Sequence, residues 1–158
     1  GFMNYSLFNQ IWKADELNMS QKSKRLAKLG IDAINLLEKP INKALEKSER
    51  FEGIESIYDI AKGAEKVVSI GNHTGEGWFL TGEMIELLNN GVKNIVCLQP
   101  FGCLPNHIVG KGMLKELRRQ FKGANISPID YDPGSSEVNQ LNRIRLMMTT
   151  AKKMQKAN

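Results

Sequence analysis

The chain has 158 residues, 41% of them hydrophobic and 25% charged, which is the composition of an ordinary globular protein and excludes collagen-like, coiled-coil and disordered classes. Its net charge of +5 permits an anionic partner without requiring one, and we expect no nucleic acid. No apolar run approaches the roughly 20 residues of a membrane span. Two cysteines are too few for a disulfide scaffold, so we expect a cytoplasmic protein with no membrane partner.

The chain begins at Gly1, and no basic segment precedes an apolar core, so we expect no signal peptide and a fragment of a larger protein. Its character changes near residue 66. Before that point the pattern is helical, and after it short apolar runs alternate with helical ones. We therefore predict an N-terminal helical region over 1–65 and an α/β domain over 66–158.

Three helices are predicted in the N-terminal region, because apolar residues recur at spacings of three and four over 4–12, 26–45 and 54–64. Pro40 should break or kink the second helix, since proline lacks an amide hydrogen and crowds the preceding turn. The inward face predicted for this second helix consists of Leu26, Leu29, Ile31, Ile34, Leu37, Ile41 and Leu45.

The α/β domain should contain three parallel strands and three helices. The strands are predicted over 67–71, 94–98 and 125–131, and the helices over 75–90, from the end of the 99–112 loop to about Phe121, and over 135–155. Gly91 should end the first of these helices, and Pro128 indicates an edge strand. We predict a three-layer flavodoxin-like domain with a short parallel sheet. Because three strands are few, either the N-terminal helices close the sheet or further strands belong to the rest of a larger protein.

Three unusual loops follow the predicted strands, over 71–77, 99–107 and 130–137. Ligands of open α/β sheets bind beyond the carboxyl ends of the strands, so these loops are the predicted site. The first loop is rich in glycine and opens a helix, where exposed amides favour an anion. Its spacing matches neither the dinucleotide motif nor a P-loop, and a tight turn capped by Asn72 or Thr74 is the alternative. Its candidate ligand-binding residues are Asn72, His73, Thr74, Gly75 and Gly77.

The second loop carries Cys103, four residues before His107. A cysteine near a helix start favours the thiolate, which is both a nucleophile and a soft-metal ligand. Cys103 and His107 offer two metal ligands, and His73 would add a third if the loops meet. A structural role for Cys103 is the alternative, and a cysteine–histidine nucleophile lacks an accompanying acyl-transfer motif. Cys97 is expected in the core.

The third loop begins with Asp130 and Asp132, which should point the same way at a strand end and could hold Mg²⁺ or act on protons. We favour the alternative that Asp132 starts the last helix, with Pro133 in its first turn. Arg143 and Arg145 could bind phosphate, although exposed helix arginines are the commoner case.

Taken together, five short motifs are distinctive: GNHTGEGW (71–78), LQPFGCLPNH (98–107), GKG (110–112), IDYDPG (129–134) and EVNQLNR (137–143). The set resembles the C-terminal part of the large CoA-substrate-specific enzyme activases, which are related to the 2-hydroxyacyl-CoA dehydratases and their activators. The resemblance extends over nearly the whole chain and is densest from residue 67 onward.

The resemblance implies a long, multidomain, cytoplasmic protein of anaerobic bacteria, with ATPase modules followed by a region similar to the dehydratase subunits. Those subunits bind an oxygen-sensitive 4Fe–4S cluster through cysteines from successive α/β domains. Cys103 matches the one that follows a strand of the C-terminal domain. The other cluster ligands and the ATPase motifs are not in this sequence, which supports the fragment interpretation.

Two hypotheses follow. In the first, the chain is the C-terminal module of an activase- or dehydratase-like iron–sulfur protein and contributes Cys103 to a cluster used in ATP-driven electron transfer. In the second, it is a scaffold or binding domain without a cluster, and the 71–77 loop holds a phosphate or a CoA ester. The isolated chain should be inactive and hold no tightly bound cofactor. Its expected partners are the other domains of the parent protein, with a dimer also considered.

Overall fold

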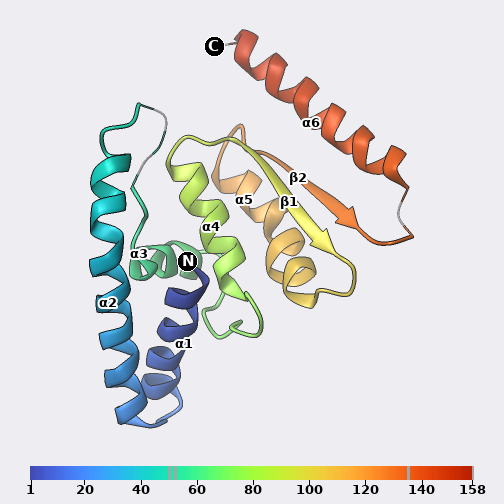
Figure 1. Ribbon diagram of the computed structural model, residues 1–158. Helices are drawn as coiled ribbons and strands as arrows, with labels where there is room; N and C mark the ends of the chain where they lie inside the picture. The colour runs from blue at the N-terminus through green and yellow to red at the C-terminus, as the bar shows by residue number, and fades with distance from the viewer. Residues whose placement is uncertain (50, 52, 135, 158) are drawn as a thin grey trace. The chain divides into compact units, whose positions relative to one another are not determined.

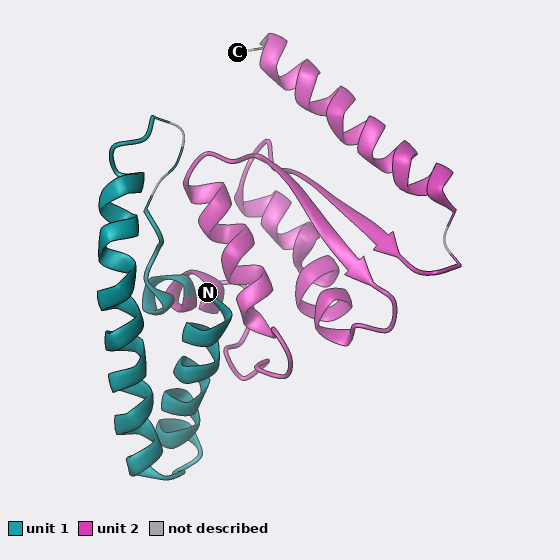
Figure 2. Ribbon diagram, in the orientation of Figure 1, with its two compact units in different colours: residues 1–60 teal, residues 61–158 magenta. Residues whose placement is uncertain are grey.

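The chain folds into two compact units, residues 1–60 and 61–158, in a computed structural model that describes residues 1–49, 51, 53–134 and 136–157 (Figure 2). The boundary between the units falls inside helix α3 (Ile57–Glu65), which begins in the first unit and ends in the second. Among the described residues, no helix is long and apolar enough to cross a membrane.

The first unit is built on a helical hairpin of α1 (Phe2–Glu16) and α2 (Gln21–Leu45), which pack side by side (Figure 1). Gly30 of α2 permits this close approach, because a Cβ atom there would lie 2.9 Å from Cδ1 of Leu7. Ser20 begins α2 and accepts a hydrogen bond from the Ser23 amide. The buried side chains of the pair include Tyr5, Ile11, Ala14, Ala27 and Ile31.

Of the two outcomes considered for Pro40, a break is not observed, and the inward face predicted for α2 is wrong. The helix does not end at Pro40 but continues to Leu45. Because Leu36 is exposed, water can satisfy its carbonyl group, which Pro40 leaves without a helical partner. The predicted inward face is also too wide, since α2 packs along the shorter α1. Ile31 is buried, whereas Leu26, Leu29, Leu37 and Ile41 are exposed.

The second unit has α/β architecture, as predicted, around a two-stranded parallel sheet of β1 (Asn94–Pro100) and β2 (Asn125–Tyr131) (Figure 1). Between the strands the chain forms a π-helical turn, η1 (Asn106–Gly110), a 3₁₀ turn, η2 (Lys111–Met113), and α5 (Leu114–Gln120). Helix α4 (Trp78–Asn89) precedes the sheet and α6 (Glu137–Ala157) follows it. One core joins α4, α5 and both strands through Met84, Ile85, Leu88, Ile95, Leu114, Leu117 and Ile126.

The predicted strand over 67–71 is absent; the chain forms turns there. The amides of Val67 and Val68 both donate to the Ala64 carbonyl, at 2.9 and 2.8 Å, so they close the end of α3 instead of joining a sheet. Val68 and Ile70 are nevertheless buried. The near-continuous apolar run thus predicted burial correctly and the secondary structure wrongly.

Gly91 ends α4 as predicted. It has a φ of +80°, its amide donates to the Leu88 carbonyl, and the Val92 amide donates to the Leu87 carbonyl at 2.8 Å. These two bonds are those of a Schellman motif, which satisfies the last carbonyl groups of a helix. The last predicted helix is observed as α6, and its predicted first residue, Ser135, lies outside the described residues.

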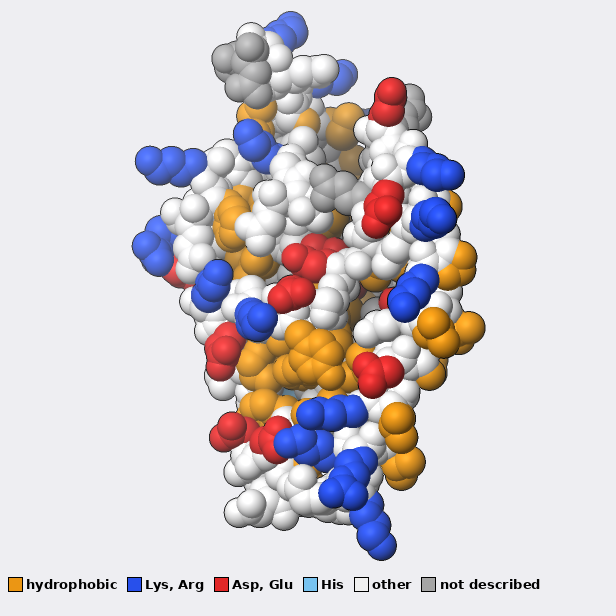
Figure 3. Space-filling view, turned by 90° about the vertical axis from the view of Figure 1, so that its left-hand side faces the viewer, with side chains coloured by type: hydrophobic (Ala, Val, Ile, Leu, Met, Phe, Trp, Pro, Cys, Tyr) orange, Lys and Arg blue, Asp and Glu red, His pale blue; other side chains and the backbone are white. Residues whose placement is uncertain are grey.

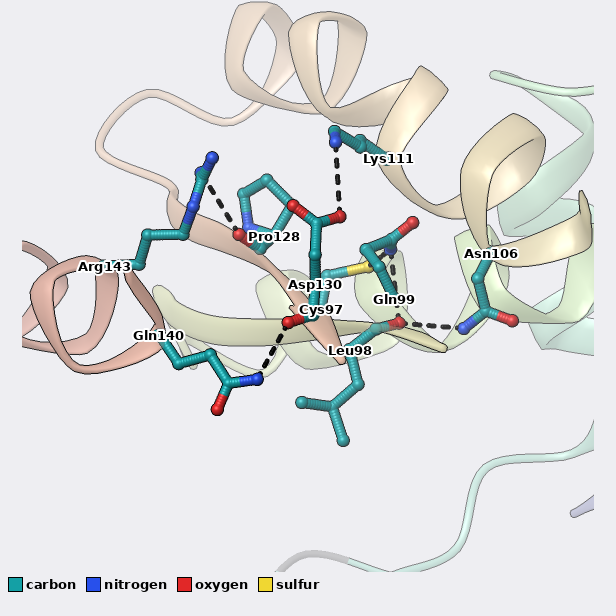
Figure 4. A network of polar contacts seen from close by, with 9 residues as sticks. All are labelled: Cys97, Leu98, Gln99, Asn106, Lys111, Pro128, Asp130, Gln140 and Arg143. Carbon is teal, nitrogen blue, oxygen red and sulfur yellow. Dashed lines mark hydrogen bonds and ion pairs between the residues drawn. The ribbon is translucent and has the colours of Figure 1, made fainter. Parts of the chain in front are cut away.

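The outer edge of β2 is covered by side-chain donors. In a parallel sheet the peptide groups of alternate residues point toward the partner strand. The amide of Asn125 donates to the Lys93 carbonyl, and the Tyr131 carbonyl accepts from the Phe101 amide, so the odd-numbered residues of β2 bond to β1 and the even-numbered ones point away from it. The carbonyl groups that face away from β1 accept side-chain hydrogen bonds, two of which Figure 4 shows. These bonds run from Arg118 to Ile126 (2.5 Å), Arg143 to Pro128 (3.4 Å) and Gln140 to Asp130 (3.1 Å). Pro128 therefore lies on an outer edge, as predicted.

The other edge of the sheet is open. The peptide groups of Val96 and Leu98 point away from β2, and the Leu98 carbonyl accepts a hydrogen bond from Asn106 Nδ2 at 2.9 Å (Figure 4). A groove of about 210 Å³ runs here between β1 and α4. The side chains of Val96 and Leu98 are 44% and 50% exposed. The backbone groups of such an edge can pair with a further strand.

Charged side chains of both signs are interspersed on the face of the molecule shown in Figure 3, around a central group of hydrophobic side chains. Several Lys and Arg side chains lie together near the bottom of this view, and elsewhere on this face the two signs are mixed. Such a distribution is that of a solvated protein surface.

Candidate functional site

The predicted loops after the two observed strands do lie at one edge of the sheet. The parallel register aligns Pro100 with Tyr131, so the chain leaves both strands at the same end. The Phe101 amide extends the ladder by donating to the Tyr131 carbonyl at 3.0 Å. This register places Asp130, the residue before the last of β2, and the loop that carries Cys103 at the same end of the sheet.

The 71–77 loop lies against the η1 segment. Gly75 has a φ of +61°, and a Cβ atom added there would come within 2.9 Å of Pro105 Cγ. The two segments enclose a cavity of about 300 Å³. Its lining consists of Gly71, Asn72, Thr74 and Gly77 on one side and Leu104, Pro105, Ile108 and Val109 on the other. The structure therefore brings the first and second predicted loops together.

The 71–77 loop presents backbone donors beside this cavity. Its ends are joined by a hydrogen bond of 2.7 Å from the Trp78 amide to the Asn72 carbonyl. Within the described part of the chain, the amides of residues 74–77 donate to no carbonyl group. They directly precede α4, whose first residue is Trp78. Free amides at the start of a helix favour a bound anion.

The capping role considered for Asn72 or Thr74 is not observed. Gly77, with a φ of +46°, occupies the N-cap position of α4, which has no side-chain cap. The Asn72 side chain instead donates to the Ser69 carbonyl at 3.1 Å. His73 is half-buried, its amide donates to the Gly71 carbonyl, and it does not line the cavity.

Cys103 is held at the end of β1 by a short chain of hydrogen bonds. Its half-buried thiol donates to Asn106 Oδ1 at 2.7 Å, and Asn106 Nδ2 donates in turn to the Leu98 carbonyl. The amide of His107 donates to the Cys103 carbonyl at 3.3 Å, and the His107 side chain is exposed. The thiol is thus fixed relative to the strand by Asn106.

Cys97 has the core role that was predicted for it. It packs against the hydrophobic core, where burial raises the pKa of its thiol and a 3.1 Å hydrogen bond from Gln99 Nε2 partly opposes that rise. Gly110 packs beside this pair, and a Cβ atom there would lie 3.4 Å from Cys97 Sγ, at the limit of ordinary contact. Cys97 is therefore harder to ionise than an exposed cysteine.

Asp130 and Asp132 do not share a site. Asp130 lies 3.5 Å from Lys111 Nζ, whereas Asp132 accepts a hydrogen bond of 2.9 Å from the Gly134 amide (Figure 4 shows the first pair). The alternative that Asp132 starts the last helix is also wrong, because α6 begins at Glu137. Asp132 stabilises a turn before that helix.

No group of three or more His, Cys, Asp and Glu side chains that could hold a metal ion occurs among the residues that the structure describes. Cys103, His107 and His73 are therefore not gathered into the metal site considered from their spacing. Cys103 by itself can supply one thiolate ligand, and a closed site requires ligands from elsewhere.

Several residues of the site were not predicted from the sequence. Pro105, Ile108 and Val109 form one wall of the cavity, and Asn106 and Lys111 bond to Cys103 and Asp130. Asn106 follows Cys103 by one helical turn, a spacing that could have indicated its contact with the thiol. Pro105, Ile108 and Val109 carry no such local signal, because they form a cavity only together with the 71–77 loop, which is distant in the sequence.

Comparison of the chain with family models, with curated proteins and with solved structures finds no match in any of the three.

The contact between the two loops can be tested with a matched pair of glycines. Gly102 also has a positive φ, of +68°, but a Cβ atom there would meet nothing within 4 Å. We expect Gly102→Ala to lose about 1 kcal/mol of unfolding free energy through backbone strain alone. Gly75→Ala should lose roughly 1 kcal/mol more, because it also displaces Pro105. Urea denaturation measures both, and equal losses would contradict the contact.

The two cysteines should differ in reactivity. At pH 8 we expect iodoacetamide to modify Cys103 about tenfold faster than Cys97, since burial limits access to Cys97 and lowers its thiolate fraction by raising its pKa. The ratio should shrink as the pH rises and Cys97 ionises. Peptide mass spectrometry gives both rates, with the urea-unfolded chain as the control. Equal rates of modification of Cys103 and Cys97 in the folded protein would contradict the difference in burial between the two thiols.

Proposed function

We propose that this chain is a module of a larger cytoplasmic protein of the CoA-enzyme activase or 2-hydroxyacyl-CoA dehydratase type. In this proposal Cys103 supplies one thiolate to an iron–sulfur cluster shared with other domains, and the cluster, when bound, carries electrons delivered by ATP-driven transfer. The proposal assigns neither ATP hydrolysis nor dehydration to these residues themselves. It rests on the resemblance of the sequence motifs and on the position of one thiol.

The observation that carries the proposal is the setting of Cys103. The residue stands directly after β1 at the carboxyl edge of a parallel sheet, where α/β proteins bind their ligands. Its thiol is half-buried and held by Asn106, so it is positioned without being enclosed. As a thiolate ligand Cys103 would no longer donate to Asn106 Oδ1, so a hydrogen bond that tunes the cluster sulfur requires the Asn106 carboxamide to turn its Nδ2 toward it.

The open edge of β1 supports membership of a larger domain. Two strands are marginal as an independent sheet, and an average sheet has about 5–6. The groove beside β1 and the exposed side chains of Val96 and Leu98 fit a continuing sheet. We propose that strands from another part of the parent protein extend it into a flavodoxin-like, three-layer domain.

A second candidate function is binding of a phosphate or a CoA ester without a cluster. The cavity of about 300 Å³ between the 71–77 loop and η1 favours it, because Thr74 and Gly77, whose amides donate to no carbonyl group among the described residues, line this cavity before the start of α4. Apolar side chains of Leu104, Ile108 and Val109 form the opposite wall. The cavity thus pairs anion-binding donors with an apolar surface, the combination that an acyl thioester of CoA presents.

Iron and acid-labile sulfide in the anaerobically purified parent protein test the first function. We expect Cys103→Ser to lose both, because serine removes a thiolate ligand, and Cys97→Ser to retain both, because Cys97 packs in the core. Circular dichroism of each variant monitors the fold. If Cys103→Ser keeps the iron and sulfide content of the unaltered protein, Cys103 is not a ligand.

Calorimetric titration of the chain with CoA tests the second function. We expect binding that Gly75→Ala weakens about tenfold, because the added methyl group displaces the loop from Pro105, and that Gly102→Ala and Cys103→Ser leave unchanged. Inorganic phosphate serves as the minimal probe. Absence of heat with either probe at millimolar concentration, or equal weakening by both glycine variants, would refute an anion site at this loop.

A further inference from the structure

A second cavity, of about 500 Å³, lies between the end of β2 and the first three turns of α6, and neither proposed function uses it. It coincides with the sequence motif EVNQLNR over 137–143, whose polar residues the site at the 71–77 loop leaves unexplained. The cavity is lined by Asp130 of β2 and by Asn139, Gln140, Asn142, Arg143 and Leu146 of α6.

The orientation of α6 is unusual for a helix that packs beside a sheet. Such a helix normally turns its apolar residues toward the sheet and its polar residues toward water. Here the carboxamides and Arg143 line the cavity beside β2, whereas the apolar side chains of Val138 and Leu141 are 62% and 40% exposed. Asn139, Asn142 and Arg143 are themselves exposed, so the polar start of the helix lines a cavity that opens to solvent beside β2.

The charges around this cavity leave one cation in excess. The Asp130 carboxylate lies 3.5 Å from Lys111 Nζ, which offsets its negative charge. Arg143 faces no carboxylate in the described residues and donates only a long hydrogen bond, of 3.4 Å, to the neutral Pro128 carbonyl. A guanidinium group has five N–H donors, so most of the donors of Arg143 stay available. Figure 4 shows Arg143 and Asp130 on opposite sides of Pro128, with Gln140 below them.

The remaining lining groups are suited to a polar ligand. The side-chain amides of Asn139 and Asn142 make no hydrogen bond within the described chain, and each offers both donors and an acceptor. Gln140 is already engaged, since its Nε2 donates to the Asp130 carbonyl and holds α6 against β2. Leu146 supplies an apolar surface at the far end. The volume is within the range of small-molecule sites, about 300–1,000 Å³.

We infer that this cavity binds a small organic oxyanion, a phosphate ester or a carboxylate, whose charged group pairs with Arg143 and whose polar groups bond to Asn139 and Asn142. The guanidinium fork matches both kinds of oxyanion with two parallel hydrogen bonds. The site uses side chains of α6 and β2 and none of the residues of the 71–77 loop or Cys103. It therefore stands or falls independently of both proposed functions.

Calorimetric titration of the chain with inorganic pyrophosphate and, separately, with succinate tests the inference and distinguishes the two ligand chemistries. Arg145 is the matched control, because it is an exposed arginine of the same helix that does not line the cavity. We expect Arg143→Gln to weaken binding of the preferred probe more than tenfold, Arg143→Lys to weaken it less, and Arg145→Gln and Gly75→Ala to leave it unchanged. In ¹⁵N correlation spectra the side-chain amide signals of Asn139 and Asn142 should shift on titration.

The inference is overturned by absence of binding of both probes at millimolar concentration, or by equal weakening in Arg143→Gln and Arg145→Gln. Loss of binding in Gly75→Ala with retention in Arg143→Gln would move the oxyanion to the 71–77 loop and equally overturn it. Far-UV circular dichroism of each variant shows that α6 is still formed. Arg143→Gln removes the charge and keeps a polar but shorter side chain, whereas Arg143→Lys keeps the charge at a similar length, so comparison of the two separates the effect of charge from that of size.

Discussion

The parallel register of β1 and β2 is the constraint on which the rest of the second unit depends. Parallel strands cannot be joined by a tight turn, so the chain must return through a crossover, and η1, η2 and α5 supply it. The crossover also completes the core with α4. Because both strands end at the same edge, the loop that carries Cys103 starts at Pro100, beside the end of β2 that carries Asp130 and Tyr131. A reversed strand would send them to opposite ends.

The two edges of this sheet differ in how many of their outward backbone groups are hydrogen-bonded. Side chains of Arg118, Arg143 and Gln140 occupy the outward carbonyl groups of β2, and Pro128 offers no amide there, so another strand finds little to bond with. On β1 the outward peptide groups of Val96 and the amide of Leu98 border a groove. This difference leaves β1 as the edge of the sheet at which a further strand can pair.

Three chemistries are available at or near the carboxyl edge, and each depends on a different kind of group. The 71–77 loop offers backbone amides, Cys103 offers one thiol, and the start of α6 offers a guanidinium group with carboxamides. Backbone donors are fixed by loop geometry, here by the contact of Gly75 with Pro105. Side-chain donors are fixed by packing and by bonds such as that of Gln140 to β2. These separate origins allow each chemistry to be perturbed alone.

The sequence by itself determined the features that depend on local chemistry. The bounds of β2, the helix end at Gly91, the edge position of Pro128 and the core role of Cys97 follow from periodicity, backbone conformation and missing donors. Only the tertiary structure decided the features that depend on contact with another part of the chain. Residues 67–71 had the pattern of a strand, but the amides of Val67 and Val68 donate to the end of α3, and Asp130 and Asp132 had the spacing of a pair but bond to Lys111 and Gly134. The inward face of α2 likewise depended on how far α1 extends beside it. In each case the sequence specifies which groups can bond or be buried, but the element that lies opposite, often distant in the chain, determines whether they are.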